Sequence, residues 1–222
     1  MRYPIVLFDL DGTLTNPGLG ITNSVMYSLK KCGIEGQPRE SLYRFIGPPL
    51  HESYEKFYSF SREQAMQAVS YYREYYEEKG MFENEVYPGI KQLLRDLIKQ
   101  GVLCLVATSK PEIYAKKILD YYELSNYFYY IAGANMDGTR TDKAEVIAYA
   151  LKQIPAEYSN KKVLMVGDRS HDIIGAKKNG IDCAGVLFGY GSREELEEAG
   201  ADFVADSVEA VRNIVFLNAA KN

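Results

Sequence analysis

The sequence predicts an α/β protein with a doubly wound, mostly parallel sheet and a small helical domain inserted near its start. Short apolar runs alternate with longer amphipathic segments over most of the chain, which is typical of a parallel sheet covered by helices on both faces. The first run, residues 4–8, is followed at once by acidic residues and glycine. Residues 16–84 break the alternation, because they contain helical segments and no convincing strand.

The α/β core is expected to comprise residues 1–15 and 85–222. Its strands are predicted as continuous apolar runs, as in sheets buried on both faces, at residues 4–8, 102–107, 127–132, 162–166, 183–188 and 202–205. Its helices are predicted at residues 88–99, 111–122, 142–152, 170–178, 193–198 and 207–216. Pro88 and Pro111 would occupy first turns, where proline loses no hydrogen bond.

The inserted segment, residues 16–84, is predicted to form a helical cap domain. Its helices are expected at residues 21–31, 40–46, 50–57 and 62–79. Ser61 and Gln64 have the spacing of a capping box, and a buried face is predicted from Ala65, Val69, Tyr72 and Tyr76. An insertion directly after the first strand is expected over the carboxyl ends of the strands, where ligands bind in open α/β sheets.

The composition is that of an ordinary globular protein, with 46% hydrophobic and 25% charged residues. A net charge of −4 without a basic cluster argues against a nucleic acid polymer as partner. No stretch approaches the roughly 20 apolar residues of a membrane helix, and the first apolar run is too short for a signal peptide. Cys32, Cys104 and Cys183 lack metal-binding spacing, so we expect reduced, buried thiols and a cytoplasmic protein.

The strongest motif is Asp-Leu-Asp-Gly-Thr at residues 9–13, at the end of the first predicted strand. Side chains two residues apart on an extended backbone point the same way, so Asp9 and Asp11 are expected to project into one crevice. Two carboxylates this close repel each other unless a cation or a proton joins them. A plain strand-to-turn junction, in which Asp-Gly favours the turn, is the structural alternative.

A second acidic pair, Asp168 and Asp172, follows the predicted strand at residues 162–166. Asp168 would stand at the carboxyl end of that strand, and Asp172 in the first turn of the next helix. Taken alone, the pair is also compatible with helix capping. Together with Asp9 and Asp11, it forms an oxygen-rich site that suits Mg²⁺.

Two further strand ends supply groups for an anion. Thr108 and Ser109 precede a helix expected to begin with proline, where backbone amides and a hydroxyl can meet a phosphate oxygen. Lys143 lies in the first turn of a predicted helix, where a positive charge opposes the helix dipole and therefore hints at function. A solvated surface lysine is the alternative for Lys143. Arg44, Arg140 and Arg169 are further candidate phosphate or substrate contacts.

With these motifs the sequence resembles the haloacid dehalogenase superfamily, in its phosphatase branch with a small helical cap, over essentially the whole chain. The likeness includes the Asp-x-Asp-Gly-Thr start, Thr108, Lys143, the Gly-Asp-x-x-x-Asp motif at residues 167–172 and the return into the core at residues 86–90. It is greatest to phosphoglycolate phosphatase-like proteins, including a subgroup assigned as 5′-nucleotidases. The resemblance implies a Rossmann-like core, Mg²⁺ as cofactor and a small phosphate monoester as substrate.

The resemblance also implies a role for each motif residue. Asp9 would be the nucleophile that becomes an aspartyl-phosphate, and Asp11 would protonate the leaving oxygen and then activate water. Asp9, the backbone carbonyl of Asp11 and Asp168 would hold Mg²⁺, with Asp172 orienting the groups around the ion. The transferring phosphoryl group would be bound by Thr108, Ser109 and Lys143.

Two other functions on the same fold stay open. A sugar phosphomutase would use the same aspartyl-phosphate, although Thr13 disfavours it because many mutases carry Val there. A non-catalytic binding protein would be expected to lack a motif Asp, and none is missing here. Ser109, Thr141 and Asn16 depart from the phosphoglycolate phosphatase pattern, which weakens assignment to phosphoglycolate itself. We expect a monomer or a weak homodimer.

Two features of the cap carry no assigned function. The chain has 19 tyrosines, several of them within residues 71–76, and we interpret this cluster as large amphipathic filler of a helix. His51 is expected at an ordinary exposed helix position.

Overall fold

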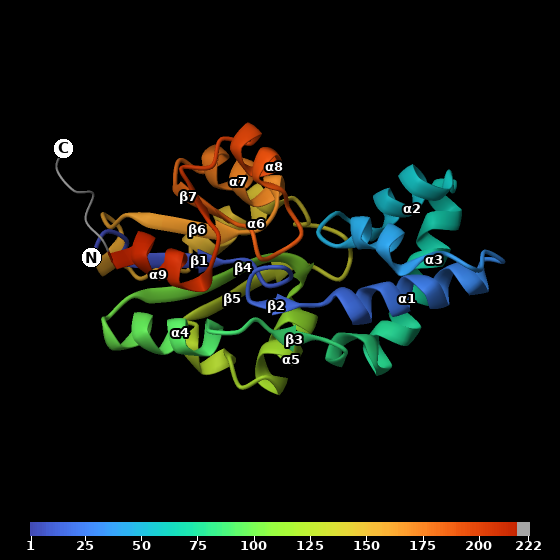
Figure 1. Ribbon diagram of the computed structural model, residues 1–222, viewed down its shortest axis with the longest axis horizontal. Coiled ribbons are helices and arrows are strands. Elements are labelled where there is room, and N and C mark those ends of the chain that lie inside the picture. Colours follow the sequence, from blue (N-terminus) through green and yellow to red (C-terminus); the bar gives the residue numbers. More distant parts are fainter. Residues whose placement is uncertain (217–222) are drawn as a thin grey trace. The chain divides into compact units, whose positions relative to one another are not determined.

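The computed structural model describes residues 1–216 (Figure 1). The described chain divides into two compact units, one formed by Met1–Thr15 with the segment from Val86 onward, the other by Asn16–Glu85. The chain passes between the units at β2 (Thr15–Asn16) and β3 (Glu85–Val86), which pair with each other.

The first unit is built on a six-stranded sheet in the order β5-β4-β1-β6-β7-β8, in which all paired strands run parallel. The strands are β1 (Ile5–Phe8), β4 (Leu103–Pro111), β5 (Tyr130–Ala134), β6 (Val163–Gly167), β7 (Asp182–Val186) and β8 (Phe203–Ala205). Chain order reverses on either side of β1, so the carboxyl ends of β1, β4 and β6 border the switch point where such sheets bind ligands. The predicted doubly wound, parallel sheet is confirmed.

Helices lie on both faces of this sheet (Figure 1). They are α4 (Ile90–Lys99), α5 (Glu112–Tyr121), α6 (Lys143–Leu151), α7 (Ser170–Lys178), α8 (Arg193–Glu198) and α9 (Val208–Phe216). On one face, Ile5 and Leu7 of β1 pack in a common core with Ile147 of α6 and Ile173 of α7. All four residues of β1 are buried, which explains why its sequence is continuously apolar rather than alternating.

Several element boundaries differ from the prediction for local reasons. The helix expected from Pro88 begins at Ile90, because Gly89 precedes it in the left-handed region at φ 89°. Pro111 lies one residue before α5 rather than in its first turn. The strand expected to begin at residue 127 begins at Tyr130, since Ser125–Tyr127 forms a 3₁₀ turn.

Strand β4 carries the difference with the largest consequence. Its expected end was Ala107, but it continues to Pro111, and its register with β5 shifts between these two residues. The shift is an irregularity of the bulge type, which redirects side chains locally. Thr108, Ser109 and Lys110 lie within it.

The second unit is helical. It contains α1 (Gly18–Lys31), the 3₁₀ helix η1 (Arg39–Phe45), α2 (Leu50–Tyr58), α3 (Arg62–Glu78) and the short 3₁₀ helix η2 (Gly80–Phe82). The capping box of Ser61 and Gln64 forms as expected, and Tyr72 stacks on Tyr76 with ring centroids 5.2 Å apart, which fits their interpretation as packing residues. The segment at residues 40–46 is 3₁₀ rather than α-helical, and His51 is half-buried rather than exposed.

No helix within residues 1–216 is both long and apolar enough to cross a membrane. Cys104 and Cys183 are buried free thiols, whereas Cys32, at the end of α1, is only half-buried.

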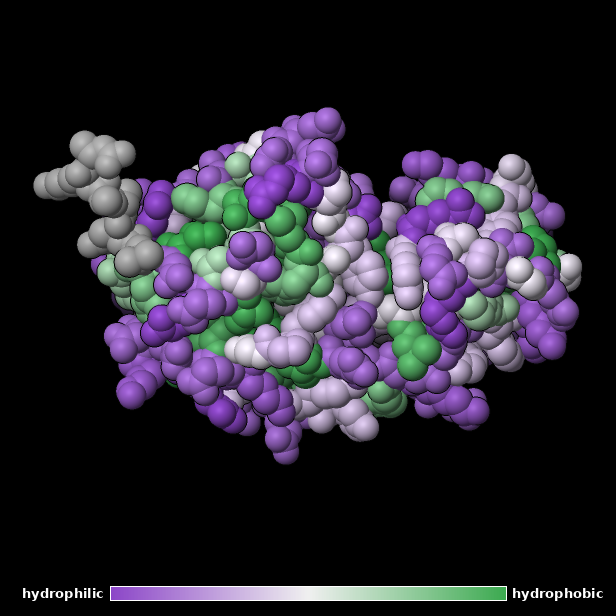
Figure 2. Space-filling model, in the orientation of Figure 1, coloured by the Kyte–Doolittle hydropathy of each residue, from purple (hydrophilic) through white to green (hydrophobic). Residues whose placement is uncertain are grey.

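In the first unit, exposed large apolar side chains include Ile98 and Tyr121. Figure 2 shows apolar residues between hydrophilic ones on its visible face, as on ordinary protein surfaces.

Candidate active site

The loop after β1 holds Asp9 and Asp11 at the edge of the sheet. The amide of Asp9 still donates to Val166 O of β6 at 2.9 Å, and then the carbonyl of Leu10 accepts three amides and closes a tight turn. Gly12 adopts φ 83°, and a Cβ at this position would lie 2.1 Å from Oδ2 of Asp168. The glycine of the motif is therefore required for a close approach between the loop and Asp168 as well as for the turn.

Asp168 and Asp172 are held beside this loop by backbone amides. Oδ2 of Asp168 accepts from the amide of Tyr190 at 2.8 Å, and Oδ2 of Asp172 accepts from the amide of Arg169 at 3.1 Å. One carboxylate oxygen each of Asp9, Asp168 and Asp172 lies within 4.8 Å of the others. The structure thus brings the two acidic motifs together at one edge of the sheet.

Lys143 joins the two acidic motifs. Its Nζ lies 2.8 Å from Oδ1 of Asp9 and 2.9 Å from Oδ1 of Asp172, and it donates a hydrogen bond to Ala107 O at 3.2 Å. Its side chain is only 5% exposed, so the alternative of a solvated surface lysine is wrong. Burial lowers the pKa of Lys143, but Asp172 and Asp9 outweigh burial and raise it above its usual value.

The start of α6 explains how a lysine occupies a first helical turn. Asp142 caps the helix, because its side chain accepts from the amides of Ala144 at 2.8 Å and Glu145 at 3.4 Å. The cap satisfies two of the free amides of the helix start and offsets the unfavourable charge of Lys143.

Lys110 is a site residue that the sequence reasoning missed. Its Nζ lies 2.8 Å from Oδ2 of Asp11, and the two side chains are 7% and 13% exposed. Burial raises the pKa of Asp11, and Lys110 only partly counteracts this. The sequence places Lys110 directly after Thr108 and Ser109, but the direction of its side chain depends on the irregularity of β4.

Thr108 and Ser109 lie at the same edge of the sheet. Thr108 is 2% exposed, and its Oγ1 accepts from the amide of Lys110 at 3.3 Å. Ser109 is half-buried. The carbonyl of Ala107, directly before Thr108, accepts a hydrogen bond from Nζ of Lys143. This bond connects the two segments that are expected to bind phosphate, the end of β4 and the start of α6.

The site contains more negative than positive charge. The carboxylates of Asp9, Asp11, Asp168 and Asp172 lie beside the ammonium groups of Lys110 and Lys143. These six groups leave two negative charges if all ionise, and Arg169 adds a weaker opposing charge near Asp168. Oδ1 of Asp11 and Oδ1 of Asp168 are buried without a hydrogen-bond partner among residues 1–216. Such groups are costly to bury unless something neutralises them.

The pKa shifts follow from this imbalance. Burial, with Asp172 and Asp9 adding to it, raises the pKa of Asp168 well above its usual value. Burial also raises the pKa of Asp172 to about 6, against the opposing charge of Lys143. A divalent cation with a preference for oxygen ligands would supply the missing charge, so these residues fit Mg²⁺.

A glycine-containing loop packs on Asp168. A Cβ on Gly189 would lie 2.3 Å from Gly12 O, and one on Gly191 would lie 2.0 Å from Asp168 O. Next to it, Oε1 of Glu195 accepts from the amide of Ser170 at 2.8 Å and from Nε of Arg169 at 2.9 Å. The sequence did not predict these contacts of Glu195, because they depend on the approach of α8 to the start of α7.

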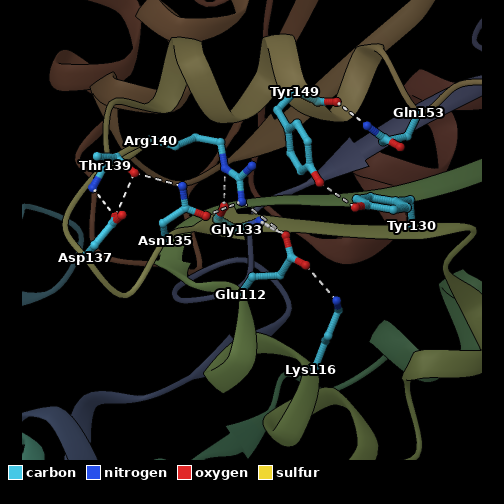
Figure 3. Close-up of polar contacts among 10 residues, drawn as sticks. All are labelled: Glu112, Lys116, Tyr130, Gly133, Asn135, Asp137, Thr139, Arg140, Tyr149 and Gln153. Atoms are coloured by element: carbon cyan, nitrogen blue, oxygen red, sulfur yellow. Dashed lines mark hydrogen bonds and ion pairs between the residues drawn. The ribbon is translucent and has the colours of Figure 1, made fainter.

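Arg140 organises the loop that leads to Lys143 (Figure 3). It adopts φ 53°, and it donates from Nε to Gly133 O at 2.8 Å and from Nη2 to Oδ1 of Asn135 at 2.9 Å. Its guanidinium carbon lies 3.8 Å from the ring centroid of Tyr149, which is a cation–π contact. These protein partners engage the guanidinium group, so its interpretation as a phosphate contact is not supported.

The fold and this geometry define an α/β enzyme with a cluster of carboxylates and lysines at the switch point of a parallel sheet. The family model of the haloacid dehalogenase-like hydrolases matches residues 6–186. The chain belongs to this family, and the predicted family and the prediction of a hydrolase are confirmed.

Similar proteins include phosphatases and one protein named as a kinase. A 5′-nucleotidase of Pseudomonas aeruginosa is 41% identical over 217 residues, which cover 97% of this chain and 96% of that protein. The crystal structure of a predicted phosphatase from Clostridium acetobutylicum is 45% identical with a TM-score of 0.89, covering 97% of this chain and 99% of that one. The tyrosine-protein kinase PtkA of Mycobacterium tuberculosis is 38% identical over 200 residues, which cover 90% of this chain and 67% of that protein.

Proposed function

We propose that this chain is a magnesium-dependent phosphatase that hydrolyses small phosphate monoesters through an aspartyl-phosphate on Asp9. The observation that carries the proposal is the buried contact between Lys143 and Asp9 beside Asp168 and Asp172. A carboxylate nucleophile divides hydrolysis into two easier steps, and this one is held in place by a cation.

In the first step, an oxygen of Asp9 forms a bond to phosphorus while the bond between phosphorus and the ester oxygen breaks. Asp11 gives its proton to the departing oxygen, so the alcohol leaves neutral. In the second step, Asp11 takes a proton from a water molecule as the water oxygen attacks phosphorus. Inorganic phosphate leaves and the carboxylate of Asp9 is restored. General acid–base catalysis of this kind contributes about 10²–10⁴-fold.

The phosphoryl oxygens need positive charge and hydrogen-bond donors, because phosphoryl transfer depends on positioning and electrostatics. Lys143, Thr108 and Ser109 would provide them. Mg²⁺ would be held by Asp9, the backbone carbonyl of Asp11 and Asp168, with Asp172 orienting the neighbouring groups. When bound, the ion stabilises the charge that develops on the transferring group.

The substrate classes that we propose are nucleoside 5′-monophosphates and phosphoglycolate-like acids. The name of the Pseudomonas aeruginosa relative supports the first class. A sugar phosphomutase remains the second candidate, because it would use the same Asp9 and Asp11. We propose further that the protein acts in the cytoplasm, as a monomer or weak homodimer and without a nucleic acid polymer as partner.

The test is release of inorganic phosphate from a panel of nucleoside monophosphates, phosphoglycolate and sugar phosphates in the presence of Mg²⁺. We expect the Asp9→Asn variant to lose release from every active substrate while its circular dichroism spectrum is unchanged. The matched control is Asp96→Asn on α4, whose carboxylate pairs with Arg212 at 3.1 Å, and it should keep full activity. Retained turnover by Asp9→Asn would contradict the nucleophile, and isomerised sugar phosphate with little free phosphate would identify a mutase.

A further inference from the structure

Lys110 is a buried cation of the active site to which the proposed reaction gives no role so far. Its side chain is 7% exposed, and its Nζ contacts Oδ2 of Asp11 at 2.8 Å. Its backbone lies in the irregular part of β4, where the register shifts between Ala107 and Pro111. Without the shift, a regular strand would alternate its side chains between the two faces of the sheet.

The contact with Lys110 makes the two oxygens of Asp11 unequal. Oδ2 contacts the ammonium group, whereas Oδ1 is buried and has no hydrogen-bond partner in the part of the chain that the structure describes. A carboxyl group held by one oxygen has little freedom to rotate, so the direction of the other oxygen is fixed. An unpartnered buried oxygen is costly, which is a reason to expect that it meets a group of the substrate.

Lys110 is itself anchored next to the phosphate-binding segment. Its amide donates to Oγ1 of Thr108 at 3.3 Å, so the residue that would contact the phosphoryl group and the residue that holds Asp11 are connected within one short segment. A displacement of this segment would therefore move both groups together.

A stability role alone is a weaker explanation of the pair. A buried ion pair contributes little net stability, because removing both charges from water costs about as much as their attraction returns. The exposed pair of Lys177 and Asp202, 2.6 Å apart with 41% and 31% exposed side chains, provides a comparison outside the active site. It lies at the amino end of β7, where Asp202 also accepts from the amide of Cys183.

We propose that Lys110 is a positioning residue for the acid–base step, which holds Oδ2 of Asp11 so that Oδ1 faces the ester oxygen of the substrate. The inference rests on the proposed phosphatase function. Each buried lysine then has its own carboxylate to position: Lys143 orients the nucleophile Asp9, and Lys110 orients the acid Asp11.

The test compares two esters that share the phosphoryl group and differ in the need for a proton. The first is the alkyl phosphate that the wild type hydrolyses best, whose alcohol must be protonated as it leaves. The second is p-nitrophenyl phosphate, whose phenolate leaves without a proton. We expect Lys110→Met to lower kcat/KM for the alkyl ester at least about tenfold more than for the aryl ester. This ratio reports formation of the aspartyl-phosphate, in which only the alkyl ester needs an aligned general acid, whereas the second step, with Asp11 as base, is common to both esters.

Three further variants define the result. Lys110→Arg keeps the cation and should restore part of the loss for the alkyl ester. Lys110→Gln keeps a hydrogen-bond donor but removes the charge, and it replaces Lys110→Met if that variant does not fold. Lys177→Met is the matched control and should leave both esters unaffected. Circular dichroism and the stabilisation by Mg²⁺ verify that each variant is folded.

An equal fall in kcat/KM for both esters would overturn the positioning role, because it would make Lys110 a group that binds the phosphoryl group that the two esters share. That result leaves the proposed phosphatase function intact. A wild type that releases phosphate from neither ester would overturn the proposed function and this inference with it.

Discussion

The ammonium group of Lys143 lies 2.8 Å from Oδ1 of Asp9, at the start of α6 and the end of β1 respectively. The contact is buried, and the same nitrogen reaches Asp172 at 2.9 Å. One lysine therefore fixes Asp9, the proposed nucleophile, relative to the second acidic motif, which makes Lys143 the first target for substitution.

We expect Lys143→Met to lower kcat at least about 100-fold, because it removes the charge that we propose stabilises the transferring phosphoryl group. It should also lower the free energy of unfolding by about 3–5 kcal/mol, since two buried carboxylates lose their partner. Phosphate release and urea unfolding measure the two effects. The double variant Lys143→Met/Asp172→Asn should have a higher free energy of unfolding than Lys143→Met alone, because it no longer buries an unpaired carboxylate at residue 172. Losses in the free energy of unfolding that simply add would contradict this coupling.

Stability of the metal-free protein should depend on pH through Asp168. Burial, Asp172 and Asp9 raise the pKa of this carboxyl above its ordinary value of 3.8, so the folded state holds a proton that the unfolded chain releases. The resulting stabilisation is complete below pH 3.8 and is lost as pH rises through the raised pKa. Asp172, with its pKa raised to about 6, acts in the same direction up to that pH.

In EDTA at pH 8, Asp168→Asn should therefore be more stable than the wild type, although we expect it to be inactive. The difference in the free energy of unfolding should shrink at pH 4.5, because the pH then approaches 3.8, the ordinary pKa below which the raised pKa of Asp168 no longer costs stability. Urea unfolding at both pH values provides the measurement, and a difference independent of pH would refute the assigned cause.

Addition of Mg²⁺ should raise the melting temperature of the wild type, because a ligand that binds only the folded state stabilises it by mass action. The increase should be lost in Asp168→Asn and kept in Asp96→Asn. EDTA should stop phosphate release, and excess Mg²⁺ should restore it. Equal stabilisation of all three proteins would mean that the ion binds elsewhere.

Arg140→Met should lower kcat by about tenfold and the free energy of unfolding by about 1–3 kcal/mol, since the loop before Lys143 loses charged hydrogen bonds. Arg140→Lys should restore little, because an ammonium group does not reproduce the planar fork that bonds Gly133 and Asn135 while covering Tyr149 (Figure 3). Arg193→Met, in an exposed pair with Glu197, is the control. Full recovery of kcat by Arg140→Lys would show that charge alone suffices.

The parts of the structure that sequence predicts well are those with a local cause. The apolar run at residues 4–8 and the one at residues 162–166 become β1 and β6 to within one residue at each end, because strands buried on both faces need continuous apolar sequence. Asp9, Asp11, Asp168 and Asp172 meet because the carboxyl ends of parallel strands share one edge. Their catalytic and metal-binding roles remain predictions.

The parts that sequence did not predict depend on contacts between distant segments. The burial of Lys110 follows from the irregular pairing of β4 with β5, and no local pattern marks that irregularity. Glu195 reaches Ser170 only because α8 approaches α7. Arg140 turns toward Gly133 from a left-handed backbone conformation, which a non-glycine residue rarely adopts.

The position of β1 between β4 and β6 also constrains how the protein is made. β1 is synthesised before both of its neighbours, and the second of them, β6, is complete only when residue 167 has been synthesised. Until then an all-apolar strand has an open edge, which is the kind of segment that associates with other chains. Nascent chains that stop before β6 should therefore depend on chaperones, and gain of solubility should coincide with completion of that strand.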